Sequence, residues 1–143
     1  MTYCFDMDGT IFDLYSVDNW LADLIAENPR PYEVAKPMIN FSRLAKRIHK
    51  VQAQGHKVEI ISWLSKNSTL EYDEKVTKAK INALMEHLPS VEWDNIYIVP
   101  YGTPKSEVTK AKNAILFDDE ERNRNEWTKG MAYAPDKIFE VMA

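Results

Sequence analysis

Short apolar segments rich in β-branched and aromatic residues alternate along the chain with longer segments whose apolar residues recur at helical spacing. This alternation is typical of a parallel sheet that is covered by helices on both faces. It predicts five strands, at residues 3–5, 57–62, 95–99, 114–117 and 131–134. The sequence therefore predicts an α/β fold of three layers.

Helices are predicted between these strands. In residues 41–53 apolar side chains return every three or four residues, and Gly55 beyond them fits the left-handed end of a helix. A second long helix is predicted at residues 69–87, where Val76 and Leu84 belong to the apolar stripe. Shorter helices are predicted at residues 104–110, 120–128 and 136–142.

Residues 11–38 do not belong to a minimal strand-helix-strand unit. They contain an apolar stretch at residues 17–25 and a proline-containing segment at residues 28–32, which predict an inserted helix followed by a stiff loop. A chain of 143 residues has the usual size of one domain. We therefore expect a single domain over residues 1–143, with residues 11–38 as a small helical cap.

The composition excludes several classes of partner. The formal net charge of −4 gives no general attraction to a nucleic-acid backbone or an anionic membrane. No apolar segment reaches membrane-spanning length, and the N-terminus reaches the charged Asp6 too early for a signal peptide. We expect a cytoplasmic protein that binds neither nucleic acid in bulk nor membranes.

The segment Phe5-Asp6-Met7-Asp8-Gly9-Thr10 places two acids at the carboxyl end of the first predicted strand. Four specified positions of this kind occur by chance in about one chain of this length per thousand. A carboxylate is ionised at neutral pH, so Asp6 can attack phosphorus without an assisting base. The turn at Gly9 can bring Asp8 near the leaving oxygen as a general acid, and later near water as a general base. A solvated acidic turn is the plainer alternative.

A second acidic segment follows the fourth predicted strand and contains Asp118 and Asp119. Taken alone, such a segment is more often a charged helix start, because acids there favour the helix dipole. However, an anionic nucleophile and a phosphate repel each other by about 4 kcal/mol per charge pair at about 4 Å and an effective dielectric of about 20. Mg²⁺ takes oxygen ligands from one or two carboxylates and offsets such repulsion. The two acidic segments together therefore predict a magnesium site.

Residues 6–10 resemble the first motif of the haloacid dehalogenase (HAD) superfamily, Asp-x-Asp-Gly-Thr after the first strand. The pair Asp118-Asp119 resembles the double-aspartate variant of that family's fourth motif. The resemblance implies a phosphatase in which Asp6 forms an aspartyl-phosphate and Asp8 serves as acid and base. It also implies that Mg²⁺ is bound by the Asp6 carboxylate, the Asp8 backbone carbonyl and one acid of the pair, with Asp118 favoured over Asp119.

The resemblance extends to two weaker positions and to the topology. Ser62 ends the second predicted strand, as does the Ser or Thr that hydrogen-bonds the phosphoryl group in the family. Lys105, after Pro104, resembles the phosphate-binding lysine, for which Lys110 and Lys112 are alternatives. The family's Rossmann-like fold has the strand order 5-4-1-2-3, which places the site beside the first and fourth strands.

The acidic pair and the helical insertion also resemble 5'(3')-deoxyribonucleotidases and polynucleotide 3'-phosphatase domains. We therefore expect a small phosphorylated substrate, a nucleotide in particular. Trp63 follows Ser62 directly, so it leaves the sheet at the rim of the predicted site and can stack on a base. Packing of Trp63 in the core is the alternative.

Other functions fit parts of this pattern. A phosphotransferase would pass the phosphoryl group from Asp6 to an acceptor other than water. A dehalogenase needs no second acid, yet Asp8 is present. A phosphoacceptor of the receiver-domain type has its acid pair on the first strand, whereas here adjacent acids follow the fourth. A binding module of the same fold that has no activity would not need the acids of the two motifs, so their presence argues against this alternative.

Overall fold

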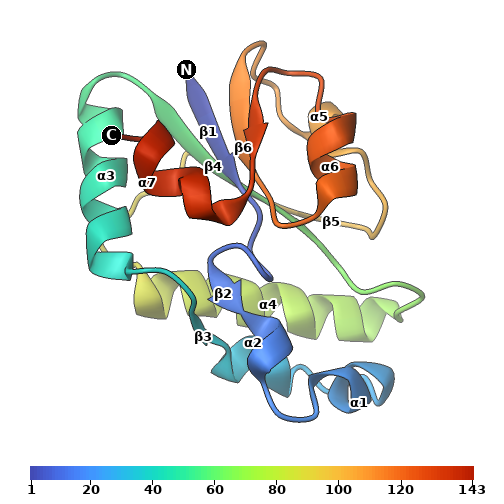
Figure 1. Ribbon diagram of the computed structural model, residues 1–143. Coiled ribbons are helices and arrows are strands. Elements are labelled where there is room, and N and C mark those ends of the chain that lie inside the picture. The colour runs from blue at the N-terminus through green and yellow to red at the C-terminus, as the bar shows by residue number, and fades with distance from the viewer.

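Figure 1 shows the computed structural model, which describes all 143 residues. Five parallel strands form the main sheet, in the order β5-β4-β1-β6-β7. Their bounds are Thr2–Phe5 for β1, Lys57–Trp63 for β4, Asn95–Val99 for β5, Ala114–Phe117 for β6 and Ala132–Tyr133 for β7. The predicted α/β class and the five parallel strands are therefore confirmed.

The labelled strand order differs from the expected 5-4-1-2-3 because the chain contains two further strands that the sequence did not predict. β2 (Phe12–Asp13) and β3 (Lys36–Pro37) pair antiparallel in a separate sheet and take the second and third labels. Counted within the main sheet alone, the strands lie in the order 3-2-1-4-5, which is 5-4-1-2-3 read from the other edge. β1 is therefore central, between β4 and β6.

Alternate side chains of β1 enter different cores on the two faces of the sheet. Tyr3 and Phe5 join a cluster of 18 buried residues that includes Leu44 and Ile138. Cys4 points to the opposite face and packs in a smaller cluster that contains Trp127. Full burial of a large apolar side chain contributes about 1.5–3 kcal/mol. Because both faces are buried, a shift of β1 by one residue would be costly, and the end of the strand is firmly positioned.

Helices cover both faces of the sheet (Figure 1). α3 (Phe41–Ala53) has the predicted bounds, and its preceding residue Asn40 caps it by accepting a hydrogen bond from the Arg43 N–H at 3.0 Å. α4 (Leu70–His87) crosses from β4 to β5. The later helices are α5 (Lys105–Val108), α6 (Glu121–Glu126) and α7 (Ile138–Val141), the last preceded by a 3₁₀ turn at Pro135–Lys137. None of the helices combines the length and apolar composition that crossing a bilayer requires.

The insertion between β1 and α3 lies beyond the carboxyl ends of the main strands (Figure 1). Besides β2 and β3, it contains a 3₁₀ turn at Leu14–Ser16, α1 (Trp20–Ile25) and α2 (Arg30–Val34). The stiff loop predicted at 28–32 is wrong in its second part, because α2 begins at Arg30. Pro31 lies in the first helical turn, where its missing N–H removes no helical hydrogen bond. Tyr32 of α2 packs with Tyr72 of α4, which ties the insertion to the domain.

Candidate active site

Asp6 lies directly after β1, at the carboxyl edge of the sheet. Its backbone N–H donates to the Phe117 carbonyl at 2.9 Å, which holds Asp6 beside the end of β6. The chain then turns tightly, because the N–H groups of Ile11 and Phe12 both donate to the Met7 carbonyl at 3.0 Å. The first acidic motif is thus fixed by backbone contacts on both sides of Asp6.

Gly9 has a conformation and a position that suit glycine alone. Its φ is +80°, in the left-handed region that other residues rarely adopt. A Cβ atom here would lie 2.4 Å from Asp119 Oδ2 and 2.9 Å from Tyr15 Cε2. The glycine therefore allows the turn to approach the second acidic motif closely.

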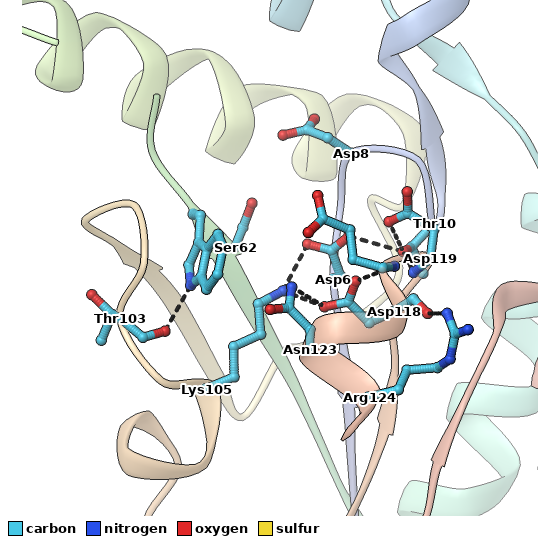
Figure 2. A network of polar contacts seen from close by, with 12 residues as sticks. Asp6, Asp8, Thr10, Ser62, Thr103, Lys105, Asp118, Asp119, Asn123 and Arg124 are labelled. Atoms are coloured by element: carbon cyan, nitrogen blue, oxygen red, sulfur yellow. Dashed lines mark hydrogen bonds and ion pairs between the residues drawn. The ribbon is translucent and has the colours of Figure 1, made fainter. Parts of the chain in front are cut away.

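Three carboxylates from the two motifs converge at this point (Figure 2). Asp6, Asp118 and Asp119 offer oxygen atoms that lie within 4.8 Å of one another. The Thr10 hydroxyl donates to Asp6 Oδ2 at 2.9 Å, lies 3.2 Å from Asp119 Oδ1 and accepts the Asp119 N–H at 3.1 Å. Thr10 therefore connects the two motifs directly.

Lys105 is the cation of this cluster. Its Nζ lies 2.9 Å from Asp6 Oδ1 and 2.7 Å from Asp118 Oδ2, and the residue is 5% exposed. Burial alone would lower the pKa of Lys105, but the carboxylates of Asp6 and Asp118 more than reverse this effect and raise it. One ammonium group thus contacts two of the three clustered carboxyl groups, and no cation of the protein contacts the third, Asp119.

The adjacent acids Asp118 and Asp119 have different surroundings. Asp118 is fully buried, and both of its oxygens accept hydrogen bonds, Oδ1 from the Glu120 N–H and Oδ2 from Lys105 and Asn123. Asp119 Oδ2 accepts no hydrogen bond from the protein. Burial, followed by the charge of Asp6, raises the pKa of Asp118 to about 6 and that of Asp119 to about 7. A cluster of three carboxyl groups, in which Asp119 Oδ2 has no donor from the protein, fits a hard divalent cation that takes oxygen ligands.

Asp8 and Ser62 are joined by a residue that the sequence analysis did not single out, Lys80 of α4. Lys80 Nζ lies 2.9 Å from Asp8 Oδ2 and donates to Ser62 Oγ at 2.7 Å. Burial raises the pKa of Asp8, against the opposing effect of Lys80. The sequence does contain a sign that Lys80 is buried. Lys80 is four residues from both Val76 and Leu84, so it interrupts the apolar stripe of its helix.

A cavity of about 180 Å³ opens above the acids. Asp6, Asp8 and Lys105 line its polar part, together with Asp118. Five aromatic residues also line it: Tyr15, Trp20 and Tyr32 come from the insertion, Trp63 is the last residue of β4, and Tyr101 follows β5. The structure thus combines a charged floor with aromatic walls.

Trp63 is half-buried at the wall of this cavity, and its ring is held in place. Its Nε1–H donates to the Thr103 carbonyl at 2.8 Å, and its ring centroid lies 5.1 Å from that of Tyr101. Lys105 Nζ is 5.7 Å from the ring centroid. The rim position expected for Trp63 agrees with this geometry.

The other expected site residues lie as follows. Asp6, Lys105, Asp118 and Asp119 converge, while Asp8 lies apart from them (Figure 2). Asp8 instead contacts Lys80. Ser62 is close to Asp8 through Lys80, but it is fully buried and does not line the cavity.

Comparisons with protein-family models and with curated proteins find no match. Among solved structures, D,D-heptose 1,7-bisphosphate phosphatase from Burkholderia thailandensis is similar, with a TM-score of 0.53 and 10% identity over 92% of this chain and 90% of that one. The HAD domain of effector protein Lem4 from Legionella pneumophila has a TM-score of 0.51 and 16% identity, over 99% of this chain and 92% of that one. At identities this low the likeness concerns the fold alone: this chain shares the fold of these two structures, one of which is described as a HAD domain.

Proposed function

We propose that this chain is a Mg²⁺-dependent phosphomonoesterase that transfers the phosphoryl group of its substrate to Asp6 and then to water. The observation that carries the proposal is the convergence of Asp6, Lys105 and the pair Asp118-Asp119 at the end of β1. The HAD-type fold supports it, since one of the similar structures is named as a phosphatase.

In the first half-reaction, a carboxylate oxygen of Asp6 attacks phosphorus, and the bond from phosphorus to the leaving oxygen breaks. Asp8 gives its proton to that leaving oxygen, so an alcohol departs and an aspartyl-phosphate remains. Lys105 and Thr10 hold the two Asp6 oxygens at 2.9 Å each, which orients the nucleophile. The raised pKa of Asp8 favours its protonated form, as this step requires.

In the second half-reaction, water attacks the phosphorus of the aspartyl-phosphate. Asp8 takes a proton from this water, and the bond between phosphorus and Asp6 breaks to release inorganic phosphate. The carboxylate of Asp6 and the protonated Asp8 are thereby restored. Asp8 lines the cavity with 16% of its side chain exposed, so water and substrate can both reach it.

The residues present fit Mg²⁺, because they are carboxylates with oxygens within 4.8 Å of one another. Asp6, the Asp8 backbone carbonyl and one acid of the pair would hold it. Asp119 suits the third position better than the expected Asp118, because Asp119 has an oxygen without a hydrogen bond from the protein. When bound, Mg²⁺ supplies positive charge against the phosphoryl oxygens.

The aromatic walls favour a substrate whose phosphate is attached to a group with a flat ring, and we propose a nucleotide. The experiment is a screen of phosphomonoesters with Mg²⁺, in which nucleoside monophosphates are compared with sugar phosphates and aryl phosphates. Sugar phosphates belong in the screen because one similar structure is a heptose bisphosphate phosphatase. Release of inorganic phosphate from none of these esters would contradict the proposed function.

Trp63→Ala is expected to raise the KM for nucleoside monophosphates by about five- to a hundredfold. Stacking of a base on an aromatic ring contributes roughly 1–3 kcal/mol, and 1.4 kcal/mol corresponds to about tenfold in affinity. Sugar phosphates, which have no aromatic base to stack, should keep their KM. Trp63→Phe is the control, because it retains an aromatic face without the hydrogen bond to Thr103. Equal losses on nucleotides and sugar phosphates would instead assign Trp63 to the core.

Gly9→Ala is expected to lower kcat/KM more than its effect on stability explains. A left-handed alanine costs about 1–2 kcal/mol, and the added Cβ would also displace Asp119 from its position 2.4 Å away. Gly55→Ala is a matched control, since φ there is +89° and nothing lies within 4 Å of the added Cβ. Urea unfolding should show the cost of a left-handed alanine in both variants, and any additional loss in Gly9→Ala measures the contacts of its added Cβ. If both also lose the same share of activity, close packing at Gly9 does not matter for the site.

A further inference from the structure

Lys80 is a lysine whose entire side chain is buried, with 1% of it exposed. Lysines are almost never buried to this degree unless they are paired. Lys80 Nζ donates to Ser62 Oγ and to the Trp63 carbonyl, each at 2.7 Å, and lies 2.9 Å from Asp8 Oδ2. An ammonium group has three hydrogens to donate, so these three contacts use all of them.

Two of these contacts fix Lys80 to the sheet, because Ser62 and Trp63 are the last two residues of β4. The third reaches Asp8, which belongs to the turn after β1. The ring of Tyr32, from α2 of the insertion, covers the ammonium group, with its centroid 5.1 Å from Nζ. Water is thereby largely excluded from the Lys80 ammonium group, and its hydrogen bond to Asp8 Oδ2 is stronger than it would be at the surface.

The pair leaves one oxygen of Asp8 available. Lys80 engages Oδ2, whereas Oδ1 has no hydrogen-bond partner in the protein and Asp8 lines the cavity. We propose that Lys80 is a positioning residue that holds the Asp8 carboxyl group at the cavity wall, with Oδ1 directed to the reacting oxygens. This inference rests on the proposed phosphatase function and adds a residue that acts through Asp8. It does not make Lys80 a phosphate ligand, because its three hydrogens are already used.

The role predicts a loss that depends on the leaving group. Lys80→Met keeps a similar volume but cannot hold Asp8, and misplacing a catalytic group by about 1 Å costs on the order of a hundredfold in rate. With a nucleoside monophosphate, whose alcohol must be protonated, kcat should fall about ten- to a hundredfold while KM changes little. With 4-nitrophenyl phosphate, whose leaving group departs without a proton, the single-turnover rate of Asp6 phosphorylation should fall less than about threefold.

Two comparisons separate positioning from a structural role. Lys78→Met alters an exposed lysine of the same helix and should match wild type. In an Asp8→Asn background, Lys80→Met should lower the remaining rate on nucleotides by less than about twofold, because residues that act together are not additive. Circular dichroism checks that each variant is folded. If Lys80→Met does not fold, Lys80→Gln is measured on the same two esters, with the same expected contrast.

The outcomes are distinguishable. Equal losses on both esters, or a full further loss in the Asp8→Asn background, would overturn the positioning role while leaving the phosphatase proposal intact. Wild-type rates in a folded Lys80→Met variant would overturn it as well. An inactive wild-type protein would contradict the proposed function itself, and the inference on Lys80 with it.

Discussion

Asp6→Asn is expected to abolish phosphoenzyme formation and turnover, because an amide cannot serve as the nucleophile that Asp6 provides. Asp8→Asn should instead lower turnover by about 10²–10⁴-fold, the usual contribution of general acid–base catalysis. Its slow phosphorylation by 4-nitrophenyl phosphate should persist, since this ester needs no proton donor. Rapid-quench kinetics with both variants measures the difference.

A loss of folding would not explain the Asp6→Asn result. The substitution removes the charge that Lys105 contacts at 2.9 Å, but it also relieves repulsion among Asp6, Asp118 and Asp119, and Lys105 keeps its closer contact with Asp118 at 2.7 Å. The Tm without Mg²⁺ should therefore remain the same or rise. Asp136→Asn, which alters an exposed acid of the 3₁₀ turn before α7, serves as the control for activity. Substantial turnover by Asp6→Asn would contradict the assignment of the nucleophile.

Removal of divalent cations with EDTA is expected to stop turnover, and excess Mg²⁺ should restore it. The physical reason is that Lys105 is the one cation in contact with the cluster of Asp6, Asp118 and Asp119, to which the substrate adds a further anion. Mg²⁺ should also raise the Tm of the wild-type protein, because a ligand that binds the folded state stabilises it. Undiminished turnover in chelator would contradict the metal requirement.

The two adjacent acids should respond differently. Asp119→Asn is expected to weaken Mg²⁺ binding while changing the Tm of the metal-free protein little, since Asp119 Oδ2 accepts no hydrogen bond from the protein. Asp118→Asn should lower the Tm more, because it removes the partner of Lys105 at 2.7 Å in a fully buried position. Calorimetric titration with Mg²⁺ and thermal unfolding separate these effects. The reverse pattern would return Asp118 to the role of direct metal ligand.

Much of the fold was predictable because its signals are local. The apolar periodicity of residues 41–53 gave the bounds of α3, and the apolar strands were found because both faces of the sheet are buried. The strands β2 and β3 have two residues each and depend on one another for pairing, so no local pattern marks them. The start of α2 was missed because prolines at 29 and 31 suggested a loop, although a first helical turn tolerates proline.

The site was predictable where topology brings residues together. Asp6 and Asp118 follow neighbouring parallel strands, so their convergence follows from the strand order. Lys80 was not identified, because a lysine on a helix is ordinarily exposed and its burial depends on a partner 72 positions away in the sequence, Asp8. The sequence also could not show which of the two adjacent acids keeps an oxygen free for a metal. This depends on the tertiary contacts that give Asp118 three hydrogen-bond donors and leave Asp119 Oδ2 without one.

The most direct test of the account is to identify the residue that carries the phosphoryl group during turnover. The protein is mixed with a ³²P-labelled ester and Mg²⁺ and quenched in acid. One portion is tested for acid-stable, hydroxylamine-sensitive radioactivity, and the other is reduced with borohydride, which releases the phosphate, before peptide mapping by mass spectrometry. We predict an acid-stable, hydroxylamine-sensitive label on Asp6, with Asp6 converted to homoserine by the reduction. A label on any other residue, or turnover without a phosphoenzyme under rapid quench, would contradict the central claim.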